Sequence, residues 1–242
     1  MHPISWLSDH DLRFPPIEQA LAEPDGLLAV GGDLEPERLV AAYYEGIFPW
    51  YEAGGPILWW SPDPRMVMAP RDVHLSRSLR RHIRRQPFTI TMDSAFPEVI
   101  RQCAGLREHR EGTWITTEMQ DAYVRLHELG YAHSVEVFQD GRLSGGLYGI
   151  SIGPMFFGES MFALRDNASK VAFLALARQL DDWGFKLIDC QMPTSHLATL
   201  GARPMARSTF KHWLWKYREQ PTRRGFWRFE LDIPRLIAPK RE

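Results

Sequence analysis

The sequence predicts a mixed α/β fold, in which a small N-terminal domain at residues 1–66, rich in proline, glycine and aromatic residues, precedes a larger mixed-sheet domain at residues 67–242. Proline, glycine and aromatic residues are dense before residue 67, so turns divide that part of the chain into short elements. Beyond residue 130 the predicted order of elements is β-β-β-α-β-α-β, which is typical of helices packed on one mixed sheet. The chain has 242 residues, of which 44% are hydrophobic, and this is enough to bury a sizeable core.

The first half of the chain contains four segments with helical patterns. Pro36 suits the first turn of one of them, where its missing N–H costs nothing. Asp93 and Ser94 form a cap signal for another, and Thr117 with Gln120 forms a capping-box pair for the last. We therefore expect helices at residues 35–45, 74–85, 94–104 and 117–129.

Beyond residue 130 the apolar residues alternate with a period of two. Residues 133–138 alternate in this way, Asp140-Gly141 supplies a primed hairpin turn, and residues 143–152 return as a second strand. The remaining elements are expected to be a strand at 155–161, a helix at 167–183, a strand at 186–190, a helix at 207–218 and a final strand at 226–233.

The net charge of −1 hides two basic segments. Residues 71–85 carry six arginines against Asp72, and residues 203–228 carry eight lysines and arginines against Glu219. In the predicted helix at 74–85, apolar residues recur at every fourth position, which turns the arginines toward the opposite side. Basic segments on an otherwise acidic chain indicate a field for a polyanion, with solvated helix faces as the alternative.

Several classes of protein are excluded by what the sequence lacks. No apolar run approaches the ~20 residues that span a bilayer, and the N-terminus does not resemble a signal peptide. Two cysteines make no disulfide framework, and the nine histidines show no metal-ligand spacing. We expect a reduced, cytoplasmic protein without membrane, metal or nucleotide-loop site. A nucleophilic Cys190 with His196 as its base remains a minor alternative to a buried strand cysteine.

Polar residues interrupt two predicted strands. Asp189 and Gln191 alternate onto one face where a buried strand opens into a loop, and Glu159 stands in an apolar strand. A buried carboxylate is costly unless it is paired or used, so these residues are functional candidates. The alternatives are a carboxylate that backbone groups satisfy for Asp189 and a surface position for Glu159.

Four tryptophans lie in or beside turns rather than on periodic helix faces: Trp50, Trp59, Trp60 and Trp114. Aromatic planes held on turns can stack on unpaired bases. Filling of the core is the alternative for any one of them.

Seven segments, spread over nearly the whole chain, together resemble the leucyl/phenylalanyl-tRNA–protein transferase family. They are GLLAVGGDL at 26–34, GIFPW at 46–50, WWSPDPR at 59–65, GTWIT at 112–116, FGESMF at 157–162, NASK at 167–170 and LIDCQ at 187–191. The resemblance implies a bacterial, cytoplasmic enzyme that moves Leu or Phe, and less readily Met, from aminoacyl-tRNA to proteins with N-terminal Arg or Lys. This transfer marks those proteins for N-end-rule degradation. The resemblance also implies a small N-terminal α/β domain, an N-acetyltransferase-like second domain, and no metal or dissociable cofactor. We expect a monomer.

The resemblance assigns roles to the residues that match the family. Asp189 and Gln191 are expected at the reaction centre, with Glu159 beside the amine or basic side chain of the acceptor. The 3′-terminal adenosine is expected at Trp50, Trp114, Tyr43 and Tyr123, the transferred side chain at Leu147, Met161, Phe173, Leu176 and Leu180, and the acceptor stem of the tRNA at Arg77, Arg80, Arg81, Arg84 and Arg85. The family can have Met at the position of Leu147 and exchanges Leu and Phe along the following helix, so the preference for Leu or Phe stays open.

The residues alone leave two other classes open. One is a coenzyme A-dependent N-acetyltransferase, although the glycine-rich loop expected between the third strand and its helix is missing. The other is a non-catalytic RNA-binding module that uses the arginines and tryptophans. Neither class explains carboxylates and an amide in apolar strands.

Overall fold

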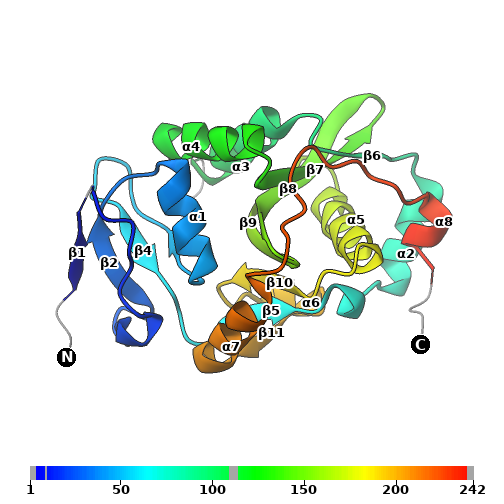
Figure 1. Cartoon of the computed structure of the whole chain (residues 1–242). Coiled ribbons are helices and arrows are strands. Elements are labelled where there is room, and N and C mark those ends of the chain that lie inside the picture. The colour runs from blue at the N-terminus through cyan, green and yellow to red at the C-terminus, as the bar shows by residue number, and fades with distance from the viewer. Residues whose placement is uncertain (1–3, 9, 109–113, 239–242) are drawn as a thin grey trace.

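The N-terminal part of the chain forms a four-stranded sheet in a computed structural model that describes residues 4–8, 10–108 and 114–238 (Figure 1). The strand order is β1-β2-β4-β3, with β1 parallel to β2 and the other pairs antiparallel. Helix α1 (Pro36–Tyr44) confirms the helix predicted at 35–45, follows β2, and buries Leu39, Ala42 and Tyr43. The strands are β1 (Ser5–Leu7), β2 (Leu27–Gly31), β3 (Phe48–Pro49) and β4 (Leu58–Trp60), with a 3-10 turn η1 at Ile17–Gln19.

A seven-stranded mixed sheet forms the larger part of the molecule, which confirms the predicted mixed α/β class. Its order is β11-β5-β10-β9-β8-β7-β6, and β10 runs parallel to β9 but antiparallel to β5. The strands are β5 (Arg65–Met68), β6 (Thr89–Met92), β7 (Ala132–Gln139), β8 (Arg142–Ile152), β9 (Met155–Ala163), β10 (Leu187–Gln191) and β11 (Arg203–Met205).

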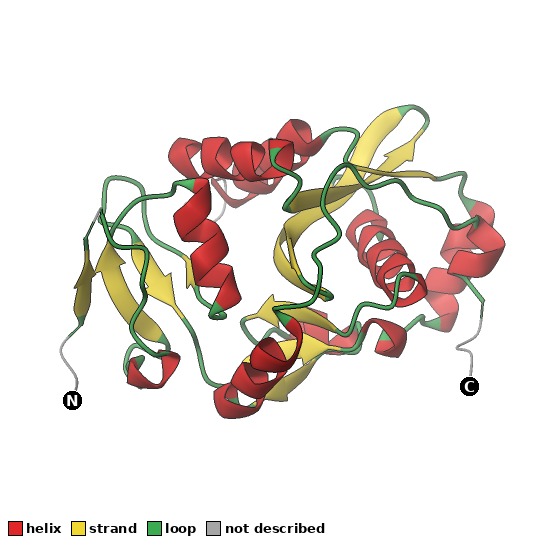
Figure 2. Ribbon diagram, viewed as in Figure 1, coloured by secondary structure: helices red, strands yellow, loops and turns green. Residues whose placement is uncertain are grey.

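Helices cover both faces of this sheet (Figures 1 and 2). Neighbouring strand residues alternate between two cores: Tyr148 and Phe157 pack with α3 (Phe96–Glu108) and α4 (Thr117–Glu128), whereas Leu147 and Phe156 pack with α5 (Ala168–Asp182). This alternation follows from the pleat of a strand, which sends successive side chains to opposite faces. The remaining helices are η2 (Pro70–Asp72), α2 (Arg77–Arg85), α6 (Ser195–Thr199), α7 (Arg207–Tyr217) and α8 (Ile233–Leu236). None of the described helices is long and apolar enough to cross a membrane.

The hairpin prediction is confirmed. Asp140 and Gly141 connect β7 to β8 with positive φ angles of 50° and 71°, as a primed two-residue turn requires. Three strands of the large sheet were not predicted, namely β5, β6 and β11. Each has only three or four residues, which is too short for a reliable period of two.

The predicted strand at 226–233 is wrong. The chain there is extended, and Trp227 and Leu231 are buried between exposed neighbours, but it pairs with no strand of the described structure. Its backbone N–H groups find side chains instead, since Trp227 N donates to Asp93 Oδ2 at 2.6 Å and Glu230 N donates to Gln179 Oε1 at 2.8 Å. Alternating burial therefore arose without a ladder of backbone hydrogen bonds.

Helix α4 begins at Thr117, as predicted, whereas α3 begins at Phe96 instead of residue 94, and the capping signals of both helices differ from the prediction. The N-cap of α4 is Thr116, whose hydroxyl accepts from Met119 N at 3.2 Å, one residue before the predicted capping pair. Asp93 does not cap α3, because its carboxylate accepts from Ser134 N and lies 2.8 Å from His133 Nδ1. A polar side chain therefore does cap α4, although it is Thr116, whereas the Asp93 carboxylate binds residues of strand β7.

Three of the eight cations of the second basic segment contact the N-terminal part of the chain. Lys211 pairs with Glu18 and Arg218 pairs with Glu45, both at 2.5 Å, while Arg207 Nη1 donates to the Ser61 carbonyl. These cations tie α7 and the residues after it to the N-terminal part. Lys211 and Arg218 are thus paired with carboxylates of the same chain, which weakens the polyanion interpretation for these two of the eight cations.

The predicted boundary after residue 66 stays a prediction. Strand β5 begins before it, at Arg65, and already belongs to the large sheet. One core contains residues from both sides of the boundary, for example Ala42 and Tyr43 of α1 with Tyr123 of α4.

Candidate active site

The centre of the large sheet is irregular where β9 and β10 lie side by side. Their parallel pairing runs from Leu187–Met155 to Asp189–Phe157. On the other side of β9, Gly158 faces Gly149 while Ser160 faces Tyr148, so Glu159 is the extra residue of a bulge. Bulges re-aim side chains and are common beside active sites. The bulge explains how a carboxylate comes to stand at the middle of an apolar strand.

A cavity of about 370 Å³ opens at this point. Trp50, after β3, and Trp114, before α4, are among the residues that form its wall. Its polar lining includes Glu159, Ser160 and Gln191, and the rest is mostly apolar. The cavity therefore combines aromatic, apolar and acidic surfaces within one space.

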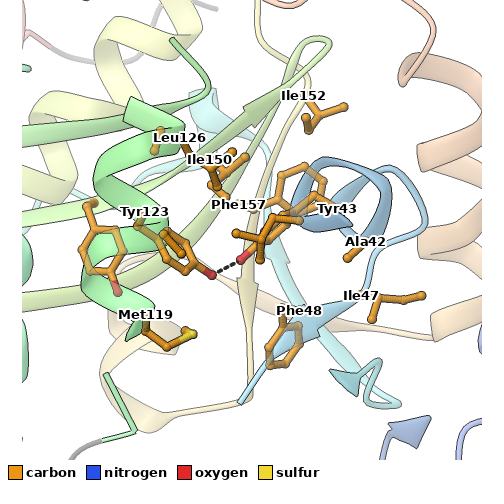
Figure 3. Packing of buried hydrophobic residues seen from close by; sticks show 14 of the residues in the cluster. Ala42, Tyr43, Ile47, Phe48, Met119, Tyr123, Leu126, Ile150, Ile152 and Phe157 are labelled. Carbon is orange, nitrogen blue, oxygen red and sulfur yellow. Dashed lines mark hydrogen bonds between the residues drawn. The ribbon is translucent and has the colours of Figure 1, made fainter. Parts of the chain in front are cut away.

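Glu159 is almost completely buried and fully hydrogen-bonded. Its Oε1 accepts from Tyr43 Oη and from Gln191 Nε2, each at 2.6 Å, and its Oε2 accepts from Tyr123 Oη at 3.2 Å. Figure 3 shows the two tyrosine hydroxyls directed toward one another from α1 and α4, 2.5 Å apart. Burial raises the pKa of Glu159 to about 7, although these three hydrogen bonds favour the ionised form.

Asp189 is paired with an arginine that sequence reasoning missed. Arg65 Nε donates to Oδ1 at 2.9 Å and Arg65 Nη2 donates to Oδ2 at 2.7 Å, and both side chains are fully buried. Asp189 is not among the residues that line the cavity. The expectation that alternation turns Asp189 and Gln191 to the same ligand-facing side is therefore wrong, because the strand is irregular between them.

Gln191 lines the cavity from a left-handed backbone conformation. Its backbone φ angle is +62°, a value that residues other than glycine rarely adopt. Its backbone N–H donates to Asp189 Oδ1 at 2.8 Å, and its side-chain Nε2 donates to Glu159. Arg65, Asp189, Gln191 and Glu159 thus form one continuous series of hydrogen bonds, which we call the polar chain.

The four predicted adenosine residues separate into two pairs. Trp50 is 38% exposed and Trp114 is half-buried, and both line the cavity. Tyr43 and Tyr123 are completely buried and hold Glu159, so neither offers a ring face for stacking on a base. Of the GTWIT segment, residues 112 and 113 lie outside the described residues.

Two further tryptophans of the N-terminal part, Trp59 and Trp60, have structural roles. Trp59 is fully buried and donates its Nε1 hydrogen to the Gly31 carbonyl at 2.9 Å, so it fills the core. Trp60 donates its own Nε1 hydrogen to the Trp50 carbonyl, with the two rings 5.5 Å apart. Trp60 therefore supports the backbone and ring of Trp50.

Four of the five residues predicted for the transferred side chain line the cavity: Leu147, Met161, Phe173 and Leu176. Leu180 does not. It lies one turn further along α5, where it is completely buried in the core between the helix and the sheet. The prediction of an apolar subsite is thus supported by geometry for four residues, and Leu180 packs behind it.

The predicted tRNA-binding arginines lie on α2, which packs beside α5 (Figure 1). The helix begins at Arg77, later than expected, because Ser76 caps it by accepting from Leu79 N. Leu79 and Ile83 are buried, while the side chains of Arg77, Arg81, Arg84 and Arg85 are exposed and that of Arg80 is half-buried. The helix therefore presents at least four solvated guanidinium groups on its outer side.

Comparison with known proteins agrees with this architecture. The family model of the leucyl/phenylalanyl-tRNA protein transferase matches residues 67–215, and that of its N-terminal domain matches residues 32–63. The leucyl/phenylalanyl-tRNA–protein transferase of Stutzerimonas stutzeri (strain A1501) is 58% identical over 219 residues, which cover 90% of this chain and 97% of the relative. The chain belongs to the leucyl/phenylalanyl-tRNA–protein transferase family. It is accordingly an aminoacyltransferase, whose family name implies aminoacyl-tRNA and protein substrates.

Solved structures share only general features with this transferase. L-PGS from Bacillus licheniformis matches at 12% identity with a TM-score of 0.42, covering 71% of this chain and 55% of that one. A GCN5-related N-acetyltransferase from Kribbella flavida matches at 13% identity with a TM-score of 0.35, covering 71% and 61%. Both likenesses concern the arrangement of helices and strands and carry no information on chemistry.

The cavity of this transferase contains further groups that the sequence did not single out as binding residues. Ser160 Oγ is buried and has no hydrogen-bond partner within the described structure, and His196 lies at an exposed part of the lining. Cys190 lines the same space, but burial raises the pKa of its thiol, which disfavours the thiolate that a nucleophile needs. The Cys190–His196 alternative therefore loses its support. Among the described residues, no cluster of three or more metal-ligating side chains is present.

Proposed function

We propose that this transferase moves Leu or Phe, and less readily Met, from aminoacyl-tRNA to the N-terminal Arg or Lys of cytoplasmic proteins, as a monomer, and so marks them for N-end-rule degradation. The observation that carries the proposal is a buried carboxylate, Glu159, at a cavity that is otherwise mostly apolar and aromatic. An apolar subsite fits the donated side chain, and a carboxylate fits a cationic acceptor. The combination suits a reaction between an apolar aminoacyl ester and a basic N-terminus.

We assign the donor's adenosine to the part of the cavity wall that Trp50 and Trp114 form, which we call the tryptophan wall. Trp50 and Trp114 line the same cavity as the apolar subsite of Leu147, Met161, Phe173 and Leu176. An aminoacyl ester carries its side chain only a few bonds from the ribose, so both subsites must belong to one space. This requirement is met by a cavity of about 370 Å³.

The chemistry requires alignment more than activation. The ester of an aminoacyl-tRNA is already reactive, and an α-amino group has a reference pKa of about 8, so part of it is neutral at physiological pH. The amine nitrogen attacks the ester carbonyl, the new peptide bond forms, and the 3′-oxygen leaves and receives a proton. Holding amine and ester in contact supplies much of the rate.

Gln191 is assigned to orient the attacking amine. Its Nε2 donates to Glu159, which fixes the side-chain amide and leaves Oε1 as its accepting atom. Oε1 can accept an N–H of the amine, while the Glu159 carboxylate attracts the cationic acceptor. Delivery of the proton to the leaving oxygen can use either this network or the neighbouring ribose hydroxyl.

The function is tested with labelled Leu-tRNA and three acceptor proteins that differ only in an N-terminal Arg, Lys or Ala. We expect label on the Arg and Lys proteins and none on the Ala protein. Equal labelling of the Ala protein would contradict the assignment of a cationic acceptor.

Trp114→Ala is expected to weaken binding of a short aminoacyl-adenosine by about 1–3 kcal/mol, the usual contribution of a base stacked on an aromatic ring. Isothermal titration measures this affinity directly. Trp215→Ala is the matched control, because Trp215 is exposed and does not line the cavity. An unchanged affinity with a lowered melting temperature would show that Trp114 only fills space.

The α2 arginines are tested by salt dependence. Each phosphate that a cation neutralises releases counterions, so losing a contact flattens the plot of log affinity against log salt by about one unit. We expect Arg81→Ala with Arg84→Ala to raise the KM for full tRNA and to flatten this slope, while a minimal aminoacyl-adenosine donor is unaffected. The control pair Arg142→Ala with Arg228→Ala removes the same charge from two other exposed positions. Equal effects of both pairs would mean that only net charge matters.

A further inference from the structure

We propose that Arg65 is a positioning residue of the transfer reaction: it holds Asp189 so that Gln191 keeps the conformation that presents its amide to the substrate. The proposal rests on the function proposed above. It assigns the effect of Asp189 on the reaction to geometry, because Asp189 lies outside the cavity lining and Gln191 lies within it.

The Arg65 side chain lies in the core, between two aromatic rings. The side chain is fully buried, and its guanidinium carbon lies 4.9 Å from the ring centre of Phe48 and 4.7 Å from that of Phe210. A charge in such surroundings is costly unless it is paired. Asp189 supplies the pairing with both carboxylate oxygens, and the guanidinium fork leaves that carboxylate one orientation.

The orientation of Asp189 decides the conformation of Gln191. Oδ1, the oxygen that accepts from Arg65 Nε, also accepts from Gln191 N at 2.8 Å. The φ angle of +62° at Gln191 is unfavourable for a non-glycine residue and persists only where the surroundings impose it. We identify the Asp189 carboxylate, held by Arg65, as the group that imposes it. The side chain then lies where Nε2 reaches Glu159.

Arg65 also reaches the segment that leads to the tryptophan wall. Its Nη1 donates to the Gly46 carbonyl at 2.9 Å, and Gly46 is followed by β3 and Trp50. Gly46 has a φ angle of +74°, and an added Cβ would lie 2.6 Å from Leu214 and 2.7 Å from Phe210. One guanidinium group thus sets the distance between the strand that carries Gln191 and the loop that carries Trp50. An acyl transfer between two substrates depends on this distance.

Lysine cannot replace this arginine. An ammonium group keeps the charge but lacks the planar fork that meets both carboxylate oxygens and the Gly46 carbonyl at once. We therefore expect Arg65→Lys to lower kcat for transfer to an Arg-starting acceptor by about 10²-fold, the usual effect of a small misplacement of reacting groups. The KM for aminoacyl-tRNA is expected to rise much less than kcat falls, because Trp114 and the apolar subsite, which also hold the donor, belong to other segments.

The matched control is Arg38→Lys. Arg38 is equally buried, pairs with Asp33 and donates to the carbonyls of Ser8 and Asp11, but it takes no part in the polar chain. We expect it to lower the melting temperature while kcat stays at the wild-type value. A wild-type kcat for folded Arg65→Lys, or the same loss of kcat in both variants, overturns the proposal.

Two further measurements keep the test decisive. If Arg65→Lys does not fold, the double variant Arg65→Met with Asp189→Leu removes both buried charges, a change that proteins tolerate well. It is expected to fold and to transfer about 10²-fold more slowly, because Gln191 N loses its acceptor. A wild-type rate in this variant contradicts the proposal.

Amide exchange measured by NMR separates this proposal from the proposed function. Exchange of the Gln191 N–H is expected to be about tenfold faster in Arg65→Lys than in wild type or Arg38→Lys. If wild-type protein transfers nothing, the proposed function fails, while the exchange result still decides whether Arg65 holds Gln191. Unchanged exchange in the folded Arg65→Lys variant, or in the double variant where Arg65→Lys does not fold, overturns the positioning role.

Discussion

Asp189→Ala is expected to lower the single-turnover rate of transfer by at least about 10²-fold, because Gln191 N loses its acceptor and the group that orients the amine is then misplaced. The same change is expected to lower the free energy of unfolding by about 3–5 kcal/mol, because it leaves the Arg65 guanidinium buried without its partner. The two effects arise from one contact, since both side chains are fully buried and joined at 2.7 Å.

Measurement must separate the two effects. Urea unfolding gives the fraction of folded protein, and the single-turnover rate is then expressed per folded molecule at saturating aminoacyl-tRNA. Asp189→Asn is the second variant, because it keeps the shape and can still accept from Gln191 N. We expect it to fold better than Asp189→Ala and to keep more activity.

The control for buried carboxylates in general is Asp93→Ala. Asp93 is also buried and accepts from Ser134 N and Trp227 N, but it belongs to the junction between β7 and the C-terminal segment. It is expected to lower stability without changing the rate per folded molecule. A near-normal rate for folded Asp189→Ala would show that Asp189 serves stability alone.

The reaction-centre candidates could be found from sequence because their polarity contradicts their surroundings. Glu159 and Asp189 stand in runs of apolar residues that only a buried strand explains, and burial of a carboxylate demands a partner or a task. The structure buries both, as that argument requires. The sequence could not show that Arg65 is the partner of Asp189, since Arg65 lies 124 positions before it in the chain. The one signal for this pairing in the sequence was that Arg65 directly precedes the apolar residues 66–68.

The details that the sequence could not show depend on contacts between distant segments. Tyr43 and Tyr123 were expected near the adenosine, and the structure adds that their hydroxyls converge on Glu159 from two helices. The period of two at 226–233 is shared by a strand and by an extended segment whose N–H groups meet side chains. A pattern in one segment fixes which side chains are buried, but the partner of each backbone group depends on the tertiary arrangement.

Glu159→Gln is expected to lower kcat/KM for an Arg-starting acceptor by about 10²-fold, because the loss of one charge from a buried charge pair costs roughly 2–5 kcal/mol. Gln keeps the shape and an accepting oxygen, so Tyr43 and Tyr123 can retain hydrogen bonds. The affinity for aminoacyl-adenosine is expected to stay unchanged. Tyr123→Phe is the matched control: it removes the 3.2 Å hydrogen bond to Glu159 but keeps the carboxylate, and so it should keep the preference for a cationic N-terminus.

The pH dependence gives this prediction a second readout. Burial raises the pKa of Glu159 to about 7, so the carboxylate forms only as the pH rises through that value. Wild-type kcat/KM should therefore rise with pH in two steps, one near 7 from Glu159 and one near 8 from the attacking amine, whose reference pKa is about 8. Glu159→Gln should lose the first step and keep the second. Two steps in the variant would assign the lower one to another group.

Stability should follow the same titration with a defined sign. The pKa of Glu159 in the folded state lies above the unfolded value of 4.5, so its proton is bound more tightly in the folded protein. The resulting stabilisation is fully present below pH 4.5 and is lost as the pH rises through about 7. The free energy of unfolding of wild type should thus fall relative to Glu159→Gln by roughly 3 kcal/mol between these limits, at about 1.4 kcal/mol for each pH unit. A difference between the two proteins that does not change with pH would show that Glu159 has the same pKa in the folded and unfolded states, and the carboxylate would then be ionised at neutral pH and act only as a fixed charge for the acceptor.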